Sequence, residues 1–173
     1  LKEEFGKESI YVPNGIDLEV FEYKERTFDG KIRILIEGNS DDHYKNVDES
    51  FRIVDKLDKD KYEIYYLSYQ GNAKEWYYVD KFLQRVPHDE VGKIYQSCDI
   101  LLKTSILESF SYPPLEMMAT GGIAVVAPNG GNKEYLKDED NCLLYELGKI
   151  DDAVKQIERV TKDVELRRKL IKG

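Results

Sequence analysis

The sequence lacks the features that mark several classes of protein. It has no signal peptide, no apolar run long enough to cross a bilayer, no internal repeat and no low-complexity tract. Its two cysteines, Cys98 and Cys142, lie far apart without the spacing of metal ligands, so we expect reduced thiols and no metal site. Lysine and arginine number 26 against 34 aspartates and glutamates, and no basic stripe offers phosphate contacts. This balance argues against nucleic acid as a partner.

What is present indicates one α/β domain across all 173 residues. Apolar runs typical of buried strands alternate with amphipathic helical segments, which predicts a Rossmann-like parallel sheet with helices on both faces. Asn46 and Glu49 have the spacing of a capping box before a helix. The expected strands are 31–37, 62–68, 79–83, 99–103, 123–127 and 141–145. The expected helices include 47–57, a short segment at 75–78, 89–97, a segment starting near 133, one along 150–157, and 163–170.

The segment 108–131, E-S-F-S-Y-P-P-L-E-M-M-A-T-G-G-I-A-V-V-A-P-N-G-G, organises the rest of the chain. Its two prolines suit the first turn of a helix, Gly121-Gly122 suits its end, and a buried strand follows. Glu116 then falls in the first helical turn, and Glu108 lies in the preceding loop. Two carboxylates and several unpaired backbone N–H groups should converge on one pocket, which suits a phosphate and a sugar.

Two other candidate positions, Lys45 and Gly15, each have two interpretations of similar weight. Lys45 precedes a helix, where a cation can grip a pyrophosphate, but most lysines are solvated surface residues. Gly15, in the turn P-N-G-I-D, lets the backbone approach a ligand or another domain, but a simple turn explains it equally well. The aromatic residues at 75–78 are better explained by packing than by base stacking. His88 has no predicted catalytic partner.

Taken in order, these motifs resemble a known family. V-P-N-G-I-D, then G-N and K-N around a polar loop, then D-I-L-L, E-S-F-S-Y-P-P-L-E and G-G-I-A-V-V are similar to the C-terminal half of retaining glycosyltransferases of the GT-B fold. The nearest group is family 4, whose signature is two glutamates separated by seven residues. Glu108 and Glu116 have that spacing, and the match runs from about Ile10 to the end of the chain.

The resemblance implies a role for each matching position. Glu108 would bond hydroxyls of the donor sugar, Glu116 would bond the ribose hydroxyls, and Lys45 would contact the diphosphate and stabilise the leaving group. Backbone N–H groups of the loop would hold the distal phosphate; these belong to Ser109, Phe110, Ser111 and Tyr112. The nucleotide-sugar is then a substrate, and neither a cofactor nor a metal is implied.

The chain departs from the family pattern at three positions. Asn39 stands where an arginine usually follows the glycine of the first strand, so one leaving-group cation is missing. Ser109 and Ser111 replace the glycines of the usual E-G-F-G loop. The wording S-Y-P-P-L-E-M with N-K-E is similar to bacterial rhamnosyltransferases of surface-polysaccharide assembly, and on that similarity Lys133 would partly replace the arginine.

We therefore expect a glycosyltransferase, of which this chain is the donor-binding domain. Residues 1–9 would be a remnant of the interdomain linker. A missing N-terminal domain would bind a saccharide or lipid-linked acceptor, so the chain alone would be nearly inactive. The expected location is cytoplasmic, with the full-length protein able to associate with the inner face of the membrane. Two alternatives remain open: a nucleotide-sugar epimerase of the same fold, and a non-catalytic partner subunit that lost its donor site.

Overall fold

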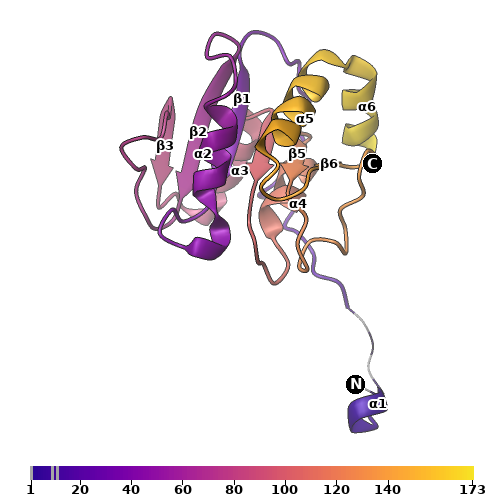
Figure 1. Cartoon of the computed structure of the whole chain (residues 1–173). Helices are drawn as coiled ribbons and strands as arrows, with labels where there is room; N and C mark the ends of the chain where they lie inside the picture. The colour runs from indigo at the N-terminus through magenta and orange to yellow at the C-terminus, as the bar shows by residue number, and fades with distance from the viewer. Residues whose placement is uncertain (1, 9, 11) are drawn as a thin grey trace.

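A single six-stranded sheet forms the centre of the computed structural model, which describes residues 2–8, 10 and 12–173 (Figure 1). Neighbouring strands pair in parallel in the order β3-β2-β1-β4-β5-β6. This confirms the Rossmann-like parallel sheet. The strands are β1 (Ile32–Glu37), β2 (Tyr62–Ser68), β3 (Lys81–Gln84), β4 (Ile100–Lys103), β5 (Ile123–Val126) and β6 (Leu143–Leu144).

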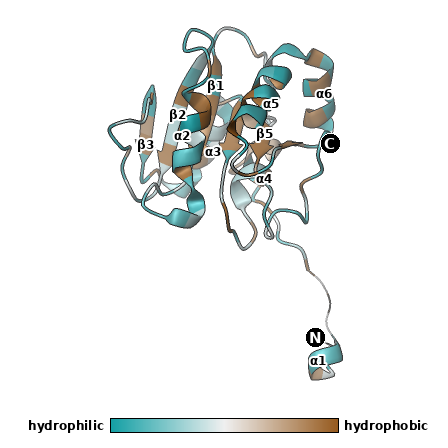
Figure 2. Cartoon of the chain, in the orientation of Figure 1, coloured by the Kyte–Doolittle hydropathy of each residue, from teal (hydrophilic) through white to brown (hydrophobic). Residues whose placement is uncertain are grey.

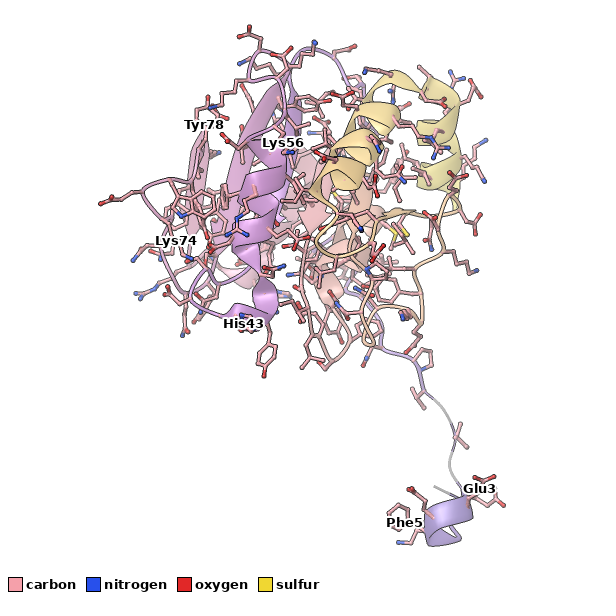
Figure 3. The ribbon with its side chains drawn as sticks, in the orientation of Figure 1. Glu3, Phe5, His43, Lys56, Lys74 and Tyr78 are labelled. Atoms are coloured by element: carbon pink, nitrogen blue, oxygen red, sulfur yellow. The ribbon has the colours of Figure 1, made fainter. Side chains whose placement is uncertain are left out.

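Helices cover both faces of the sheet. On one face lie α2 (Val47–Val54), α5 (Ile150–Lys162) and α6 (Val164–Lys172), and on the other lie α3 (His88–Ser97) and α4 (Tyr112–Ala119). Figure 2 shows that α5 carries polar residues outward while the sheet between the layers is hydrophobic. The short α1 (Lys2–Phe5) lies apart from the sheet, and Figure 3 labels Glu3 and Phe5 on it.

The alternation of side chains along β1 explains why both layers adhere. Ile34 and Ile36 point into the cluster formed with α2, α5 and α6, whereas Leu35 points into the cluster formed with α3 and α4. All three have no exposed surface. Burying such a side chain contributes about 1.5–3 kcal/mol, so an apolar run without polar alternation is stable only when covered on both faces.

Two predicted helices are wrong. Residues 130–135 form successive turns instead of a helix, because the side chain of Asn132 accepts from the backbone of Asn129, whose own side chain accepts from Gly131. Such local bonds compete with helix formation. Near 75–78 there is only a turn, since Tyr77 stacks on Phe51 of α2 at 3.7 Å between ring centroids.

The predicted capping box is also absent. Asn46 adopts the left-handed region (φ 49°) and makes no side-chain bond to the start of α2. Its amide instead donates to Glu49 and to the carbonyl of Thr104 beyond β4. At the C-terminal end, by contrast, Asp163 caps α6 by accepting from Leu166, as expected. The linker interpretation of residues 1–9 stays a prediction, and residues 1 and 9 lie outside the described residues.

Candidate active site

The order of the strands places a crevice between β1 and β4. From β1 the chain proceeds to β2 and β3 on one side, and β4 leads to β5 and β6 on the other. Parallel sheets bind ligands outside the carboxyl ends of their strands at such a switch point. A cleft of about 340 Å³ lies there. It is lined by six residues that the sequence singled out: Lys45, Glu108, Ser109, Ser111, Tyr112 and Glu116.

Lys45 and Glu108 meet across this cleft. Lys45 ends the 3₁₀ helix η1 (His43–Lys45) after β1, and its Nζ lies 2.9 Å from both carboxylate oxygens of Glu108. The hydroxyl of Ser105 donates to the same carboxylate at 2.8 Å. Burial opposes the charge on Glu108, but Lys103, Lys45 and Ser105 together outweigh it and lower the pKa of this carboxyl. Glu108 is therefore an ionised hydrogen-bond acceptor.

A second lysine, which the sequence reasoning missed, stands beside this pair. Lys103 is the last residue of β4 and is only 1% exposed. Its ammonium lies 2.5 Å from Oε2 of Glu37, which ends β1, and 3.4 Å from Oε1 of Glu108. Burial opposes the charge on Lys103, but the two carboxylates outweigh it and raise the pKa. The sequence did contain one signal: the strand β1 ends in a negatively charged residue, and the strand β4 ends in a positively charged one.

Glu116 reaches the same cleft from α4. Its carboxyl is held near the hydroxyl of Tyr95 on α3, with which it shares a hydrogen bond. Burial raises the pKa of Glu116 to about 6; the Tyr95 bond opposes the rise and the charge of Glu37 adds to it. The two glutamates of the motif thus line one cavity, but the pKa of Glu108 is lowered whereas that of Glu116 is raised.

The N-terminus of α4 also opens on the cleft. Ser111 precedes the helix in the left-handed region (φ 70°, ψ 71°), and its side chain does not cap the helix. Ser111 is 5% exposed, and its hydroxyl forms no hydrogen bond with any residue that the structure describes. Pro113 occupies the first turn, where a missing N–H is harmless. This places an unpaired hydroxyl and the positive end of a helix at the cavity wall.

Hydrogen bonds join the loop that carries Lys45 to the loop that carries Glu108. The N–H of Ile106 donates to the carbonyl of Tyr44 at 2.8 Å, and the hydroxyl of Thr104 lies 2.8 Å from the carbonyl of Asn46. Ser50 of α2 bonds to that hydroxyl at 2.8 Å. The two loops are therefore held together by contacts that do not involve their charged side chains.

The remaining predicted positions lie around the cleft without lining it. Phe110 is buried and packs edge-on against Tyr112 and beside Tyr135. The side chain of Asn39 accepts from the N–H of Asp41 at 3.0 Å in a local turn. For these positions, backbone contact to a ligand stays a prediction.

Gly15 and Lys133 differ in how near they come. Gly15 lines a second hollow of about 270 Å³ that shares Tyr112 and Glu116 with the cleft, so the turn P-N-G-I-D adjoins the site. Lys133 is exposed and lies outside the lining of both hollows. The second cation beside the site is instead Lys103, which is buried.

Comparison with known proteins identifies the family. The model of the family "Glycosyl transferases group 1" matches residues 79–173, which is more than half of the chain. The chain belongs to the glycosyl transferases group 1 family. Its match with O-antigen biosynthesis protein RfbC of Myxococcus xanthus is 37% identical over 78 residues, and covers 42% of this chain and 6% of that protein.

Solved structures show that the fold is that of GT-B glycosyltransferase domains. The C-terminal domain of the group 1 protein LpcC from Francisella tularensis has a TM-score of 0.73 at 20% identity, covering 91% of this chain and 93% of that one. Anabaena Alr3699/HepE, solved with UDP-glucose, has a TM-score of 0.76 at 14% identity, covering 91% of this chain and 49% of that one. The chain thus spans about half of HepE and a small part of RfbC.

For a group 1 glycosyltransferase, the cleft combines two kinds of surface. One part is charged, with cations and carboxylates within hydrogen-bond distance of each other. The other part is apolar and comes from β2, the β3–α3 connection and α3, through Leu67, Val86 and Val91 respectively. In the described part of the chain no group of three or more His, Cys, Asp or Glu side chains is placed to hold a metal ion, and no helix could span a bilayer.

Proposed function

We propose that this chain is the donor-binding domain of a retaining, metal-independent glycosyltransferase that transfers a glycosyl group from a nucleotide-sugar to an acceptor. One observation carries the proposal: Lys45, Glu108 and Glu116 line a single cleft at the switch point of the sheet. Side chains from η1, the β4–α4 loop and α4 come together there. The family membership supports the same chemistry.

In the proposed reaction, the cleft stabilises the departing diphosphate. When the bond between the sugar and the diphosphate breaks, negative charge grows on the phosphate oxygen that leaves. The ammonium of Lys45 lines the cavity where this charge would develop, and so does Tyr112, the first residue of α4. Because Pro113 and Pro114 carry no N–H, Tyr112 is the backbone donor that the first three positions of the helix offer to a phosphate. The hydroxyl of Ser111 adds a neutral donor at the same end. One cation, a helix dipole and a hydroxyl then perform the role that a divalent metal performs elsewhere.

The carboxylates and the apolar wall would orient the rest of the donor. Glu108 is ionised and would accept hydrogen bonds from hydroxyls of the sugar. Glu116 would accept hydrogen bonds from the ribose hydroxyls, and these bonds are stronger when the carboxyl of Glu116 is ionised. Val86 and Val91 offer a surface against which a flat base can pack.

The proposed acceptor is a saccharide or a lipid-linked saccharide held by a further domain. The chain spans 49% of HepE, and a reaction shielded from water needs both walls of a cleft. We therefore propose that the isolated chain binds nucleotide and turns over little donor. The name of the relative RfbC suggests surface-polysaccharide assembly as the setting.

Calorimetric titration with UDP, GDP and dTDP tests the donor site. The unmodified chain should bind at least one of them, and Lys45→Ala should weaken that binding by about 10- to 100-fold, the loss of a hydrogen bond to a charged group. Lys155→Ala is the matched control, because this lysine is 77% exposed on α5 and does not line the cleft. Failure of all three nucleotides to bind would overturn the proposal in favour of a non-catalytic subunit.

A further inference from the structure

We propose that Lys103 is a positioning residue of the donor cleft: it holds the charge of Glu108 so that Lys45 is available to the diphosphate. The inference rests on the proposed function, because it concerns how the same site receives an anionic donor. It assigns a task to a buried side chain that the catalytic roles above leave unused.

Four charged groups of alternating sign run across the carboxyl ends of β1 and β4. Lys45 is bonded to Glu108, Glu108 also faces Lys103, and Lys103 is bonded to Glu37. The ammonium of Lys103 donates in addition to the backbone carbonyl of Glu37 at 3.1 Å, which anchors it to β1. Two cations therefore balance two carboxylates: Lys45, Glu108 and Glu37 line the cleft, and Lys103 is buried against the two carboxylates.

Lys45 must change partners when a diphosphate enters. The ammonium of Lys45 donates to both carboxylate oxygens of Glu108 at 2.9 Å. Lys45 is nevertheless the more accessible member of the pair, with 28% of its side chain exposed against 11% for Glu108. If Glu108 had no other cation, turning Lys45 toward phosphate would leave a buried carboxylate uncompensated, and that penalty would oppose binding. Lys103, helped by the hydroxyl of Ser105, keeps Glu108 paired through the exchange.

Stability of the fold alone does not require this arrangement. A buried ion pair is a weak source of stability, and apolar residues of similar volume usually serve as well or better. Lys103 also lies where all other residues of β4 are apolar, and its long side chain ends among carboxylates of the cleft. Lys103 does not line the cleft itself, but its ammonium lies against Glu37 and Glu108, which do, and so places a second positive charge beside the cleft.

Opposite effects of two substitutions on one ion pair test the inference. Lys103→Met and Glu37→Gln both break the Lys103–Glu37 pair, so a purely structural role predicts weaker nucleotide binding, or no change, in both. The proposal predicts that Lys103→Met weakens binding of the nucleoside diphosphate found in the calorimetric titration by about tenfold or more, since Lys45 becomes the sole cation paired with Glu108. Glu37→Gln should tighten binding, because Lys103 then serves Glu108 alone.

A double-mutant cycle with Glu108→Gln identifies the route of the effect. Without the Glu108 charge, Lys103→Met should no longer weaken nucleotide binding, because no carboxylate competes for Lys45. Circular dichroism melts report whether each variant folds, and if Lys103→Met does not fold, Glu37→Gln decides alone. Unchanged or weaker binding in Glu37→Gln, or an undiminished effect of Lys103→Met beside Glu108→Gln, overturns the inference. Nucleotide binding by the unmodified chain upholds the donor site in either case. Absence of binding by the unmodified chain overturns both.

Discussion

Replacing Ser111 by glycine should stabilise the fold and at the same time weaken donor binding. Ser111 adopts φ 70° and ψ 71°, a region in which a side chain costs about 1–2 kcal/mol and glycine costs nothing extra. Its hydroxyl is buried without a partner among the described residues, which costs about 1–3 kcal/mol. Against these gains, glycine loses about 0.5–1 kcal/mol more backbone entropy on folding.

The net expectation for Ser111→Gly is a rise of about 1–4.5 kcal/mol in the free energy of unfolding, from these opposing contributions. In a chain of this size that corresponds to a melting temperature higher by roughly 2–18 °C. Nucleoside diphosphate binding should fall by about two- to tenfold, the effect of one neutral hydrogen bond. Stability is measured by urea unfolding and affinity by calorimetry.

Two control variants separate the causes. Ser109→Gly makes the same chemical change two residues earlier, where the backbone lies outside the left-handed region, and should destabilise the fold slightly. Ser111→Ala removes the hydroxyl but keeps the backbone strain, so it should share the loss of binding and only part of the gain in stability. If Ser111→Gly is less stable than the unmodified chain, or binds nucleotide equally well, the reasoning about this loop is refuted.

Two further predictions concern the wall formed by α3 and α4. Burial raises the pKa of the Glu116 carboxyl from its ordinary value of 4.5 to about 6. Between pH 4.5 and about 6 the folded chain therefore binds more protons than the unfolded chain, and the free energy of unfolding should fall as pH rises through this window. Urea unfolding at several pH values should show this slope reduced in Glu116→Gln, and an identical slope in both would contradict it; nucleotide affinity should run the other way, rising with pH. Gly92→Ala should cost about 1–3 kcal/mol or prevent folding, since a Cβ there would lie 1.8 Å from the carbonyl oxygen of Val20. Gly15→Ala, with no atom within 4 Å of its Cβ, should change stability by less than about 0.5 kcal/mol, and equal losses in both glycine variants would contradict the packing argument.

The sequence predicts the sheet well because strand signals are local and repeated. The strand 62–68 coincides with β2, and the parallel order follows from the alternation of strands and helices. The prediction at 133–136 failed because side-chain bonds of Asn129 and Asn132 replaced helical ones, a competition that hydrophobic periodicity does not register. The predicted ends of the strands lie within two residues of the observed ends, which is the usual uncertainty in where a helix or strand begins and ends.

The site was predicted in part, and its limits have a physical reason. Lys45 and Glu108 are 63 residues apart, so their meeting was expected only through the family resemblance. Lys103 and Glu37 are 66 residues apart, and nothing in either strand alone indicates that its terminal charge will be buried against the other. A charged residue at the end of a strand is usually solvated, and only the adjacency of β1 and β4 makes these two a pair.

The bonds between the Lys45 loop and the Glu108 loop have a consequence for the mechanics of the domain. Since Tyr44, Asn46, Thr104 and Ile106 already fix these segments to each other, an arriving ligand does not have to order them, and the entropy that loop closure would consume is spared. Lys45 and Glu108 are then carried by one preformed unit, so a movement of either loop displaces both charges together.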